Sequence, residues 1–201
     1  MTPTHSKHRI PPFFVFPLTL FALAMLALFG GSGGAGGLAG PASADAAQCS
    51  GASSTPKSLS AKRASGLVVC LVNKERRKRG MGSLNRVDKL AQAARGHTAH
   101  MKRKDCFAHT CPGEPDLTGR LSRANYLPCS CSWEAGENIA WGAGSQGSPR
   151  AVVNAWMNSS SHRARILDGS YQHAGVGFRH GSPFGGNKKQ GTYTLDFGAK
   201  R

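Results

Sequence analysis

The order of the hydrophobic patterns along this chain constrains its fold more than any other feature of the sequence. Apolar residues recur at helical spacing over 65–79, and a second helical pattern, capped by Asp88, reaches about Lys104. The period changes only near the end, where 174–181 and 191–198 are expected to form two strands around a turn rich in glycine, proline and asparagine. Helices first and strands last predict an α+β domain, with helices packed on an antiparallel sheet.

Two shorter helices are expected between these parts. Residues 116–124 carry two leucines on one helical face, and Ser148 with Pro149 has the pattern of a helix start. The apolar part of AGENIAWG, residues 135–142, is either a short strand or an irregular buried segment.

The first residues have the pattern of a secretory signal peptide. A basic start is followed by an apolar run over 10–29, and Ala-Ser-Ala at 42–44 is a small-residue cleavage site. An uncleaved membrane anchor is the alternative, because the apolar run is about as long as a membrane-spanning helix. We therefore expect a secreted protein, or one kept at the cell surface if the signal is uncleaved. The expected division is a signal peptide (1–44), a linker (45–64) and one domain (65–201).

All the cysteines follow this cleavage site, and an even number in a secreted chain predicts three disulfides. They are Cys49, Cys70, Cys106, Cys111, Cys129 and Cys131. Their spacings fit no familiar zinc ligand set. A bridge between Cys129 and Cys131 would close a very small, strained ring, so we expect each to pair elsewhere. Our best single pairing is Cys49 with Cys70, and the other pairings stay open.

The chain is strongly basic. Its net charge is +16, and it falls to +14 without residues 1–44, which contain Lys7 and Arg9 and no acid. Such a charge favours anionic partners, such as a cell-envelope polymer or lipid headgroups. Its densest runs, 74–79 and 102–104, fall on the expected exposed sides of helices, where a solvated face is the ordinary interpretation. We expect no specific nucleic-acid partner.

Two histidines and one glutamate stand on short connectors between expected elements, where loop residues often carry function. His109 lies between Cys106 and Cys111, His162 follows the helix that begins at 149, and Glu137 lies in AGENIAWG. Two neutral imidazoles and a carboxylate can bind Zn²⁺ or another divalent cation, with water completing the coordination. Spacing alone does not bring the three together, so ordinary loop residues are the alternative.

The other titratable candidates are weaker. His97 and His100 are one helical turn apart, and we interpret them as helix-surface residues. The serines at 159–161 stand beside His162 and could be imagined in a serine hydrolase with Glu137 as the acid. The chain has no G-x-S-x-G motif, and helix capping explains these serines better.

Six segments in order resemble a bacterial secreted CAP (SCP) domain, of the superfamily of cysteine-rich secretory proteins, antigen 5 and plant pathogenesis-related proteins. They are LVNKERRKRGMGSLNRVDKLAQAARGHTAHM, FAHT, AGENIAWG, VVNAWMNSSSHRARIL, YQHAGVGF and YTLDFG. The likeness runs from about residue 65 to 198. It implies an α-β-α sandwich with a small antiparallel sheet between helical layers.

The resemblance also implies a cleft that gathers two histidines and two glutamates. His109 and His162 match the two histidines, and Glu137 matches the glutamate of the GEN motif. Ser159 stands where animal and plant members have the other glutamate, which weakens any glutamate-dependent hydrolytic mechanism. Asn138 and Ser159 are expected to line this cleft.

The expected function is that of a secreted binding module for a divalent metal, or for a lipid or cell-envelope ligand, without an organic cofactor. The alternatives are an extracellular hydrolase that uses the histidine–glutamate cleft and a basic protein that binds envelope polyanions. Because no single reaction defines the family, enzymatic activity stays undecided and binding is preferred. We expect a monomer with no transmembrane domain in the mature chain.

Overall fold

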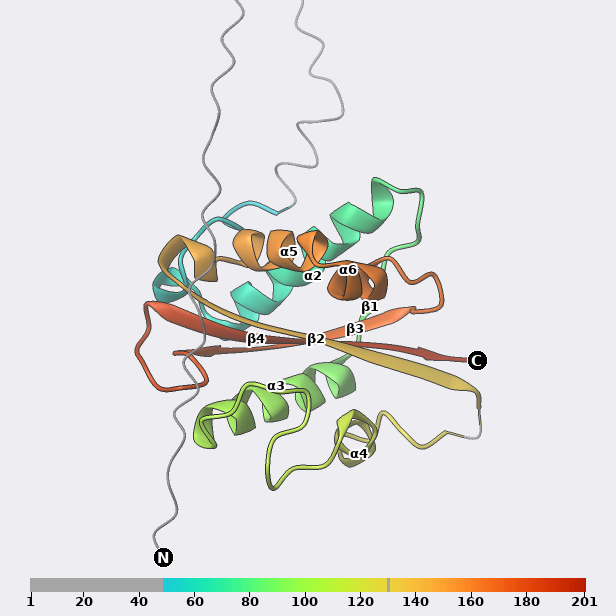
Figure 1. Cartoon of the computed structure of the whole chain (residues 1–201). Helices are drawn as coiled ribbons and strands as arrows, with labels where there is room; N and C mark the ends of the chain where they lie inside the picture. Colours follow the sequence, from blue (N-terminus) through green and yellow to red (C-terminus); the bar gives the residue numbers. More distant parts are fainter. Residues whose placement is uncertain (1–48, 130) are drawn as a thin grey trace, which may run out of the picture. The chain divides into compact units, whose positions relative to one another are not determined.

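The computed structural model describes residues 49–129 and 131–201, which form a three-layer sandwich (Figure 1). A four-stranded sheet lies between two groups of helices. On one face lie α2 (Ala61–Arg77), α5 (Pro149–Asn158) and α6 (Ser160–Ile166), and on the other lie α3 (Asp88–Arg103) and α4 (Leu117–Arg123). Two short 3-10 helices are η1 (Pro56–Ser58) and η2 (Gly144–Gly147). This arrangement confirms the expected α-β-α sandwich.

The sheet has the strand order β1-β3-β4-β2. Its strands are β1 (Asn85–Arg86), β2 (Trp133–Ala143), β3 (His173–His180) and β4 (Gln190–Lys200). The expected hairpin is present, because β3 and β4 pair antiparallel. AGENIAWG is part of a regular strand, since β2 pairs antiparallel with β4 along its whole length. The short edge strand β1 pairs parallel with β3, so the sheet is antiparallel except at that edge.

The helices lie close to where their apolar periods put them, and their ends differ for local reasons. α2 begins at Ala61 instead of residue 65, because the side chain of Ser60 accepts a backbone N–H of its first turn. In α3, Asp88 is already helical and Val87 occupies the cap position, so the expected Asp88 cap is off by one residue. Ser148 caps α5 as expected.

The described part of the expected linker packs against the domain. Cys49, Ala52 and Leu59 are buried in the main core, and Cys49 is bonded to Cys70 in α2. From residue 49 onward this segment is therefore part of the folded core, because its apolar side chains cover one end of α2.

The signal-peptide interpretation concerns residues 1–44, which lie outside the described residues. Over 49–129 and 131–201, no helix is both long and apolar enough to cross a membrane.

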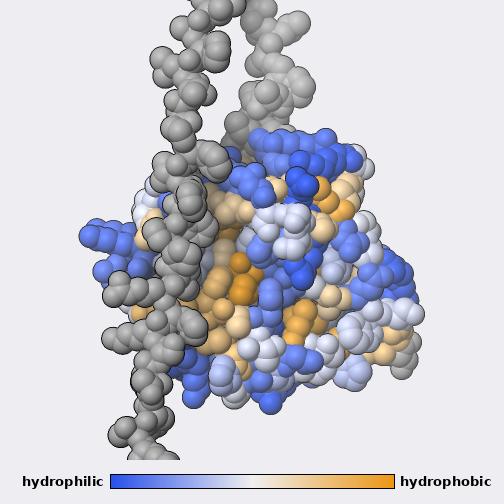
Figure 2. Space-filling model, viewed as in Figure 1, coloured by the Kyte–Doolittle hydropathy of each residue, from blue (hydrophilic) through white to orange (hydrophobic). Residues whose placement is uncertain are grey.

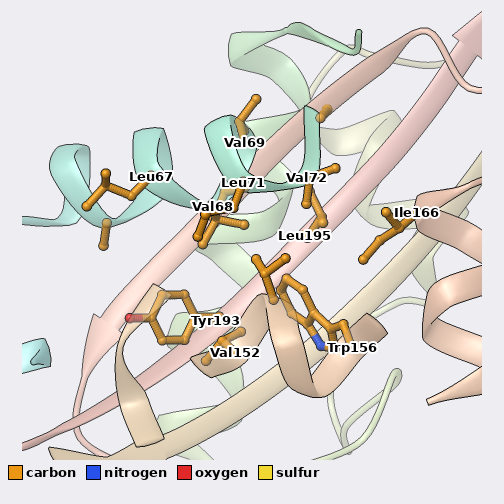
Figure 3. Packing of buried hydrophobic residues seen from close by; sticks show 14 of the residues in the cluster. Leu67, Val68, Val69, Leu71, Val72, Val152, Trp156, Ile166, Tyr193 and Leu195 are labelled. Atoms are coloured by element: carbon orange, nitrogen blue, oxygen red, sulfur yellow. The ribbon is translucent and has the colours of Figure 1, made fainter. Parts of the chain in front are cut away.

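The main core lies between the sheet and the layer that contains α2 and α5 (Figure 3). Val68 and Val72 of α2, Trp156 of α5 and Leu195 of β4 are all buried in it. Full burial of one such aliphatic side chain contributes about 1.5–3 kcal/mol. Trp156 Nε1 also donates a hydrogen bond to the carbonyl oxygen of Ile139 (3.0 Å). This contact holds β2 against α5, close to Glu137.

On the opposite face, α3 approaches the sheet very closely. A Cβ atom at Gly175 or Gly177 of β3 would run into the backbone of α3, so these positions accept no side chain. Thr98 of α3 and Thr194 of β4 share a buried hydrogen bond of 2.8 Å. α3 is therefore fixed directly against the strands that carry the candidate site.

The structure contains three disulfides, Cys49–Cys70, Cys106–Cys111 and Cys129–Cys131. The expected Cys49–Cys70 pair is confirmed. The expectation that Cys129 and Cys131 pair elsewhere is wrong. Their Cα atoms are 5.1 Å apart, within the usual range for a disulfide, so the two sulfurs can bond although only one residue separates them in sequence. The four remaining cysteines are bonded to one another, which leaves these two as partners.

Candidate functional site: the Glu137 cleft

Glu137 is a buried carboxylate near the middle of β2, with only 4% of its surface exposed. Its Oε1 accepts a hydrogen bond from His109 Nδ1, and its Oε2 accepts one from Arg120 Nη2, each at 2.7 Å. The two partners come from the loop after α3 and from α4. Glu137 is therefore neither a solvated surface charge nor a mobile side chain.

The surroundings of Glu137 keep it ionised at neutral pH. Burial, the strongest influence, raises its pKa, but the hydrogen bond from His109 and the positive charges of His97, Arg120 and His109 together lower it. The resulting pKa lies below the ordinary value of a glutamate. A buried carboxylate anion therefore stands directly behind the imidazole of His109.

The alternation of β2 sends Glu137 and Asn138 to opposite faces of the sheet. Glu137 pairs with Asp196 in the register of β2 and β4 and faces the layer of α3 and α4. Asn138 is fully buried on the other side, where its Nδ2 donates to the carbonyl oxygen of His162 in α6 (3.1 Å). Asn138 was expected to line the cleft, but its burial makes it a support for His162.

His109 lies in the loop closed by the Cys106–Cys111 disulfide. About half of its side chain is exposed (52%). Its Nδ1 donates to Glu137, whereas its Nε2 has no hydrogen-bond partner among the described residues. Arg120 Nη1 donates to the backbone carbonyl oxygen of His109 at 2.9 Å. Arg120 thus positions both the loop and the carboxylate that binds its imidazole.

His162 lies in the first turn of α6 and is held by the residue between α5 and α6. Its Nδ1 lies 2.8 Å from Ser159 Oγ, within hydrogen-bond distance. Burial lowers the pKa of His162, and the positive charges of Arg165 and His109 lower it further. His109 binds Glu137 and the backbone of His162 binds Asn138, so the two histidines are attached to adjacent residues of the edge strand β2.

A cleft of about 320 Å³ opens over Glu137. Its lining includes His109, Thr110, Asp116 and Arg165, so it extends from the His109 loop to α6. His162 and Ser159 do not line this cavity, and the expected role of Ser159 as a lining residue is replaced by its contact with His162.

His97 is the first site residue that sequence interpretation missed. It was interpreted as a helix-surface residue, but it is fully buried, and its Nδ1 lies 2.9 and 3.0 Å from the two carboxylate oxygens of Glu114. Its Nε2 lies 3.7 Å from Glu137 Oε2. The signal was the helical period, because His97 falls between Ala94 and Met101 on the apolar face of α3.

Asp196 is the second missed residue. It is fully buried opposite Glu137, and neither of its carboxylate oxygens has a hydrogen-bond partner within the described part of the chain. Burial and the negative charge of Glu137 raise the pKa of Asp196 well above its usual value. Asp196 is therefore harder to ionise than an ordinary aspartic acid, because it is buried beside the anion of Glu137. The signal was an acid at a polar position of the otherwise apolar segment YTLDFG.

The residues fit a metal ion bound by imidazole nitrogens better than one bound by the carboxylate of Glu137. Within 49–129 and 131–201, no three or more His, Cys, Asp or Glu side chains are arranged to hold a metal ion. Glu137 is poorly placed as a direct ligand, because His109 and Arg120 occupy both of its oxygens. The chemistry fits better if imidazole nitrogens are the ligands and Glu137 orients His109 from behind.

The sandwich, with Glu137 on its edge strand bonded to His109 of the loop after α3, is the arrangement expected of a CAP domain. A model of the CAP family, the cysteine-rich secretory protein family, matches residues 69–197, and this chain belongs to that family.

Two relatives come from Bacillus subtilis (strain 168). The chain is 38% identical over 137 residues to the uncharacterized protein YkwD, a match that covers 67% of this chain and 49% of YkwD. It is 33% identical over 110 residues to the uncharacterized membrane protein YlbC, covering 55% of this chain and 30% of YlbC. The chain therefore spans about half of YkwD and less than a third of YlbC.

Solved structures share the fold. An extracellular SCP-domain protein from Bacillus anthracis has a TM-score of 0.55 and 27% identity, covering 68% of this chain and 40% of that one. An outer surface protein from Borrelia burgdorferi has a TM-score of 0.56 and 19% identity, covering 67% of this chain and 91% of that one. A cysteine-rich secretory protein from Staphylococcus aureus has a TM-score of 0.51 and 19% identity, and the match covers 70% of this chain and 39% of that one. The last two matches concern the fold alone.

Proposed function

We propose that this protein is an extracellular binding module that binds a divalent cation, such as Zn²⁺, between His109, which lines the Glu137 cleft, and His162, which lies outside that cavity. The observation that carries the proposal is the 2.7 Å hydrogen bond from His109 Nδ1 to the buried Glu137. A carboxylate behind a histidine fixes the tautomer and orientation of the ring and leaves the other nitrogen as the ligand atom. Glu137 is then a positioning residue, and His109 Nε2 is the ligand.

His162 supplies the second ligand atom in this proposal. Its Nδ1 is engaged by Ser159, which leaves Nε2 available, and its lowered pKa keeps the imidazole neutral to a lower pH. A cation held by two imidazoles keeps positions for water or for a ligand. No organic cofactor is part of this proposal.

Zinc titration of protein purified without a histidine tag tests the assignment. The wild-type protein should bind Zn²⁺, and the variant His109→Ala with His162→Ala should lose this binding. Affinity should also weaken below about pH 6, because a metal-bound imidazole must be neutral. His180→Ala is the matched control, since this histidine bonds to Pro56 and not to the cleft. Unchanged Zn²⁺ affinity in the double variant would contradict the assignment of His109 and His162 as metal ligands.

The location outside the cytoplasm is part of the same proposal. Three disulfides support it, because disulfides persist in oxidising compartments. The B. anthracis relative, described as an extracellular protein, supports it as well.

A serine hydrolase is less well supported. Ser159 Oγ does approach His162 Nδ1, but Glu137 bonds to His109, so no acid among the described residues orients His162 as a triad requires. A screen with ester and peptide substrates decides the question. Activity that is present in the wild type and lost in Ser159→Ala would favour the hydrolase over the binding module.

A second binding function is favoured by an exposed aromatic pair. On the face in Figure 2, hydrophilic residues surround a few apolar patches. Two large apolar side chains, Trp141 (41% exposed) and Phe184 (59%), contact each other with ring centroids 6.4 Å apart. Lys188 and Lys189 are exposed in the same hairpin as Phe184. Aromatic and basic side chains together suit an anionic lipid surface, so we propose that this hairpin contacts such a surface.

Sedimentation with lipid vesicles tests this contact. Binding to vesicles that contain phosphatidylglycerol should exceed binding to phosphatidylcholine alone and should weaken with salt. Trp141→Ser with Phe184→Ser should reduce it, whereas Trp133→Ser, an equally exposed tryptophan at the other end of β2, should not. Equal losses of vesicle binding in both variants would contradict a specific role of the hairpin and would mean that the general positive charge of the protein explains the binding.

A further inference from the structure

A second cavity, of about 300 Å³, lies between α3 and α4. The titratable residues of its lining are His97, His100, Arg103, Glu114, Arg120 and Arg123. Glu114, the one acid in this lining, is already engaged by His97 and by the backbone N–H of Cys111. Three guanidinium groups therefore border a space whose described lining offers no unpaired carboxylate.

Gly96 keeps this cavity open. It lies in the middle of α3, where glycine is a poor helix former. The glycines of β3 are required because α3 approaches them, but a Cβ atom at Gly96 would meet no atom within 4 Å. Packing therefore does not explain this glycine. A side chain at this position would instead fill the cavity that Gly96 lines.

The arginines at the cavity have hydrogen-bond donors to spare. The guanidinium of Arg123 is exposed and makes no hydrogen bond or ion pair with any other described residue. Arg103 reaches only His100, at 3.5 Å from Nη2 to Nδ1. Arg120 is 6% exposed, and its Nε has no hydrogen-bond partner within the described residues.

We propose that this α3–α4 cavity binds a small oxyanion, carried by a phosphate or carboxylate group, between Arg103 and Arg123 and beside the buried Arg120. Planar guanidinium groups bind such oxygens through paired, charge-assisted hydrogen bonds. The volume suits a small molecule, because ligand sites begin at about 300 Å³. This use of Arg103 also gives a role to part of the basic run at 102–104.

The site is separate from the proposed metal cleft, but the two share Arg120. Arg120 binds Glu137 and the carbonyl oxygen of His109, so its substitution would disturb both sites. The exposed Arg103 and Arg123 have no contact with His109 or Glu137 among the described hydrogen bonds and ion pairs. Variants at these two residues therefore test the oxyanion site alone.

Calorimetric titration of the intact protein with inorganic phosphate, at constant ionic strength, is the test. The wild type should show saturable binding to one site. Arg123→Gln and Arg103→Gln should each weaken it at least about tenfold, because each removes a charge-assisted hydrogen-bond donor. Gly96→Leu should abolish binding, since the new side chain would occupy the space that Gly96 lines, where a Cβ atom meets no other atom within 4 Å. A parallel titration with acetate shows whether a carboxylate can occupy the site.

Arg95→Gln is the matched control, because Arg95 is an exposed arginine of the same helix that does not line the cavity. Unchanged phosphate binding in Arg123→Gln and Arg103→Gln, or an equal loss in Arg95→Gln, would overturn the proposal. If Gly96→Leu fails to fold, the arginine variants still decide. The double variant of His109 and His162 should keep its phosphate affinity, so failure of the metal proposal would not affect this result.

Discussion

Glu137 and Asn138 show how two adjacent residues of an edge strand can link it to both helical layers. The carboxylate of Glu137 receives hydrogen bonds from His109 and Arg120, while Asn138 binds the backbone of His162. The charge at position 137 therefore matters to the fold as well as to the cleft. Its removal would leave the guanidinium of Arg120 buried without its counter-charge.

Glu137→Gln should therefore lower the free energy of unfolding by about 3 kcal/mol, the effect typical of breaking a buried ion pair. Urea unfolding measures the change. Glu134→Gln is the control, because this glutamate of the same strand pairs with Arg201 at the surface and should matter little. Similar stabilities for the two variants would contradict the structural role of Glu137.

The two carboxylates should make opposite contributions to stability as pH changes. The pKa of Glu137 is lowered, so its contribution is present above the pKa of an unfolded glutamate and is lost as pH falls through its folded value. The pKa of Asp196 is raised, so its contribution is present below about pH 4 and is lost as pH rises through its folded value.

Asp196→Asn should separate these contributions, because asparagine resembles the neutral acid. The variant should lose less stability than the wild type as pH rises from about 4 through the raised folded pKa. Urea unfolding at a series of pH values measures this slope. Parallel profiles for the variant and the wild type would mean that Asp196 does not titrate differently on folding.

At the scale of elements, α3 depends on two glycines in the strand beneath it. Gly177→Ala should destabilise the protein by about 1–3 kcal/mol, because the added methyl group runs into the backbone of α3. Thermal or urea unfolding measures the loss. Gly169→Ala is the control, since a Cβ there meets no atom within 4 Å. Tolerance of alanine at Gly177 would show that α3 can move away from the sheet.

At the scale of the whole molecule, the disulfides should contribute according to the length of chain that they close. Removal of Cys49–Cys70, with a sequence separation of 21, should cost about 3 kcal/mol through the entropy of the unfolded chain. Removal of Cys129–Cys131, with a separation of 2, should cost much less. Serine double variants in urea provide the comparison, and a larger loss from the second pair would contradict this account.

Features that depend on near neighbours were determined by the sequence alone. The helical periods of α2 and α3, the serine cap of α5 and the β3–β4 hairpin all follow from residues within a few positions of one another. The ordered motifs also indicated the CAP family, and the resemblance implied a cleft that contains His109, His162 and Glu137. These features were predictable because their causes are local, or because the motifs occur together in one family.

Only the tertiary structure decided which residues surround Glu137. His97, Arg120 and Asp196 come from three different elements, and sequence spacing cannot bring them together. The same holds for the full length of β2, which is a strand because β4 supplies its hydrogen-bond partners. The physical reason is that burial and long-range pairing determine the charge and the contacts of a side chain, and both exist only once the layers have packed.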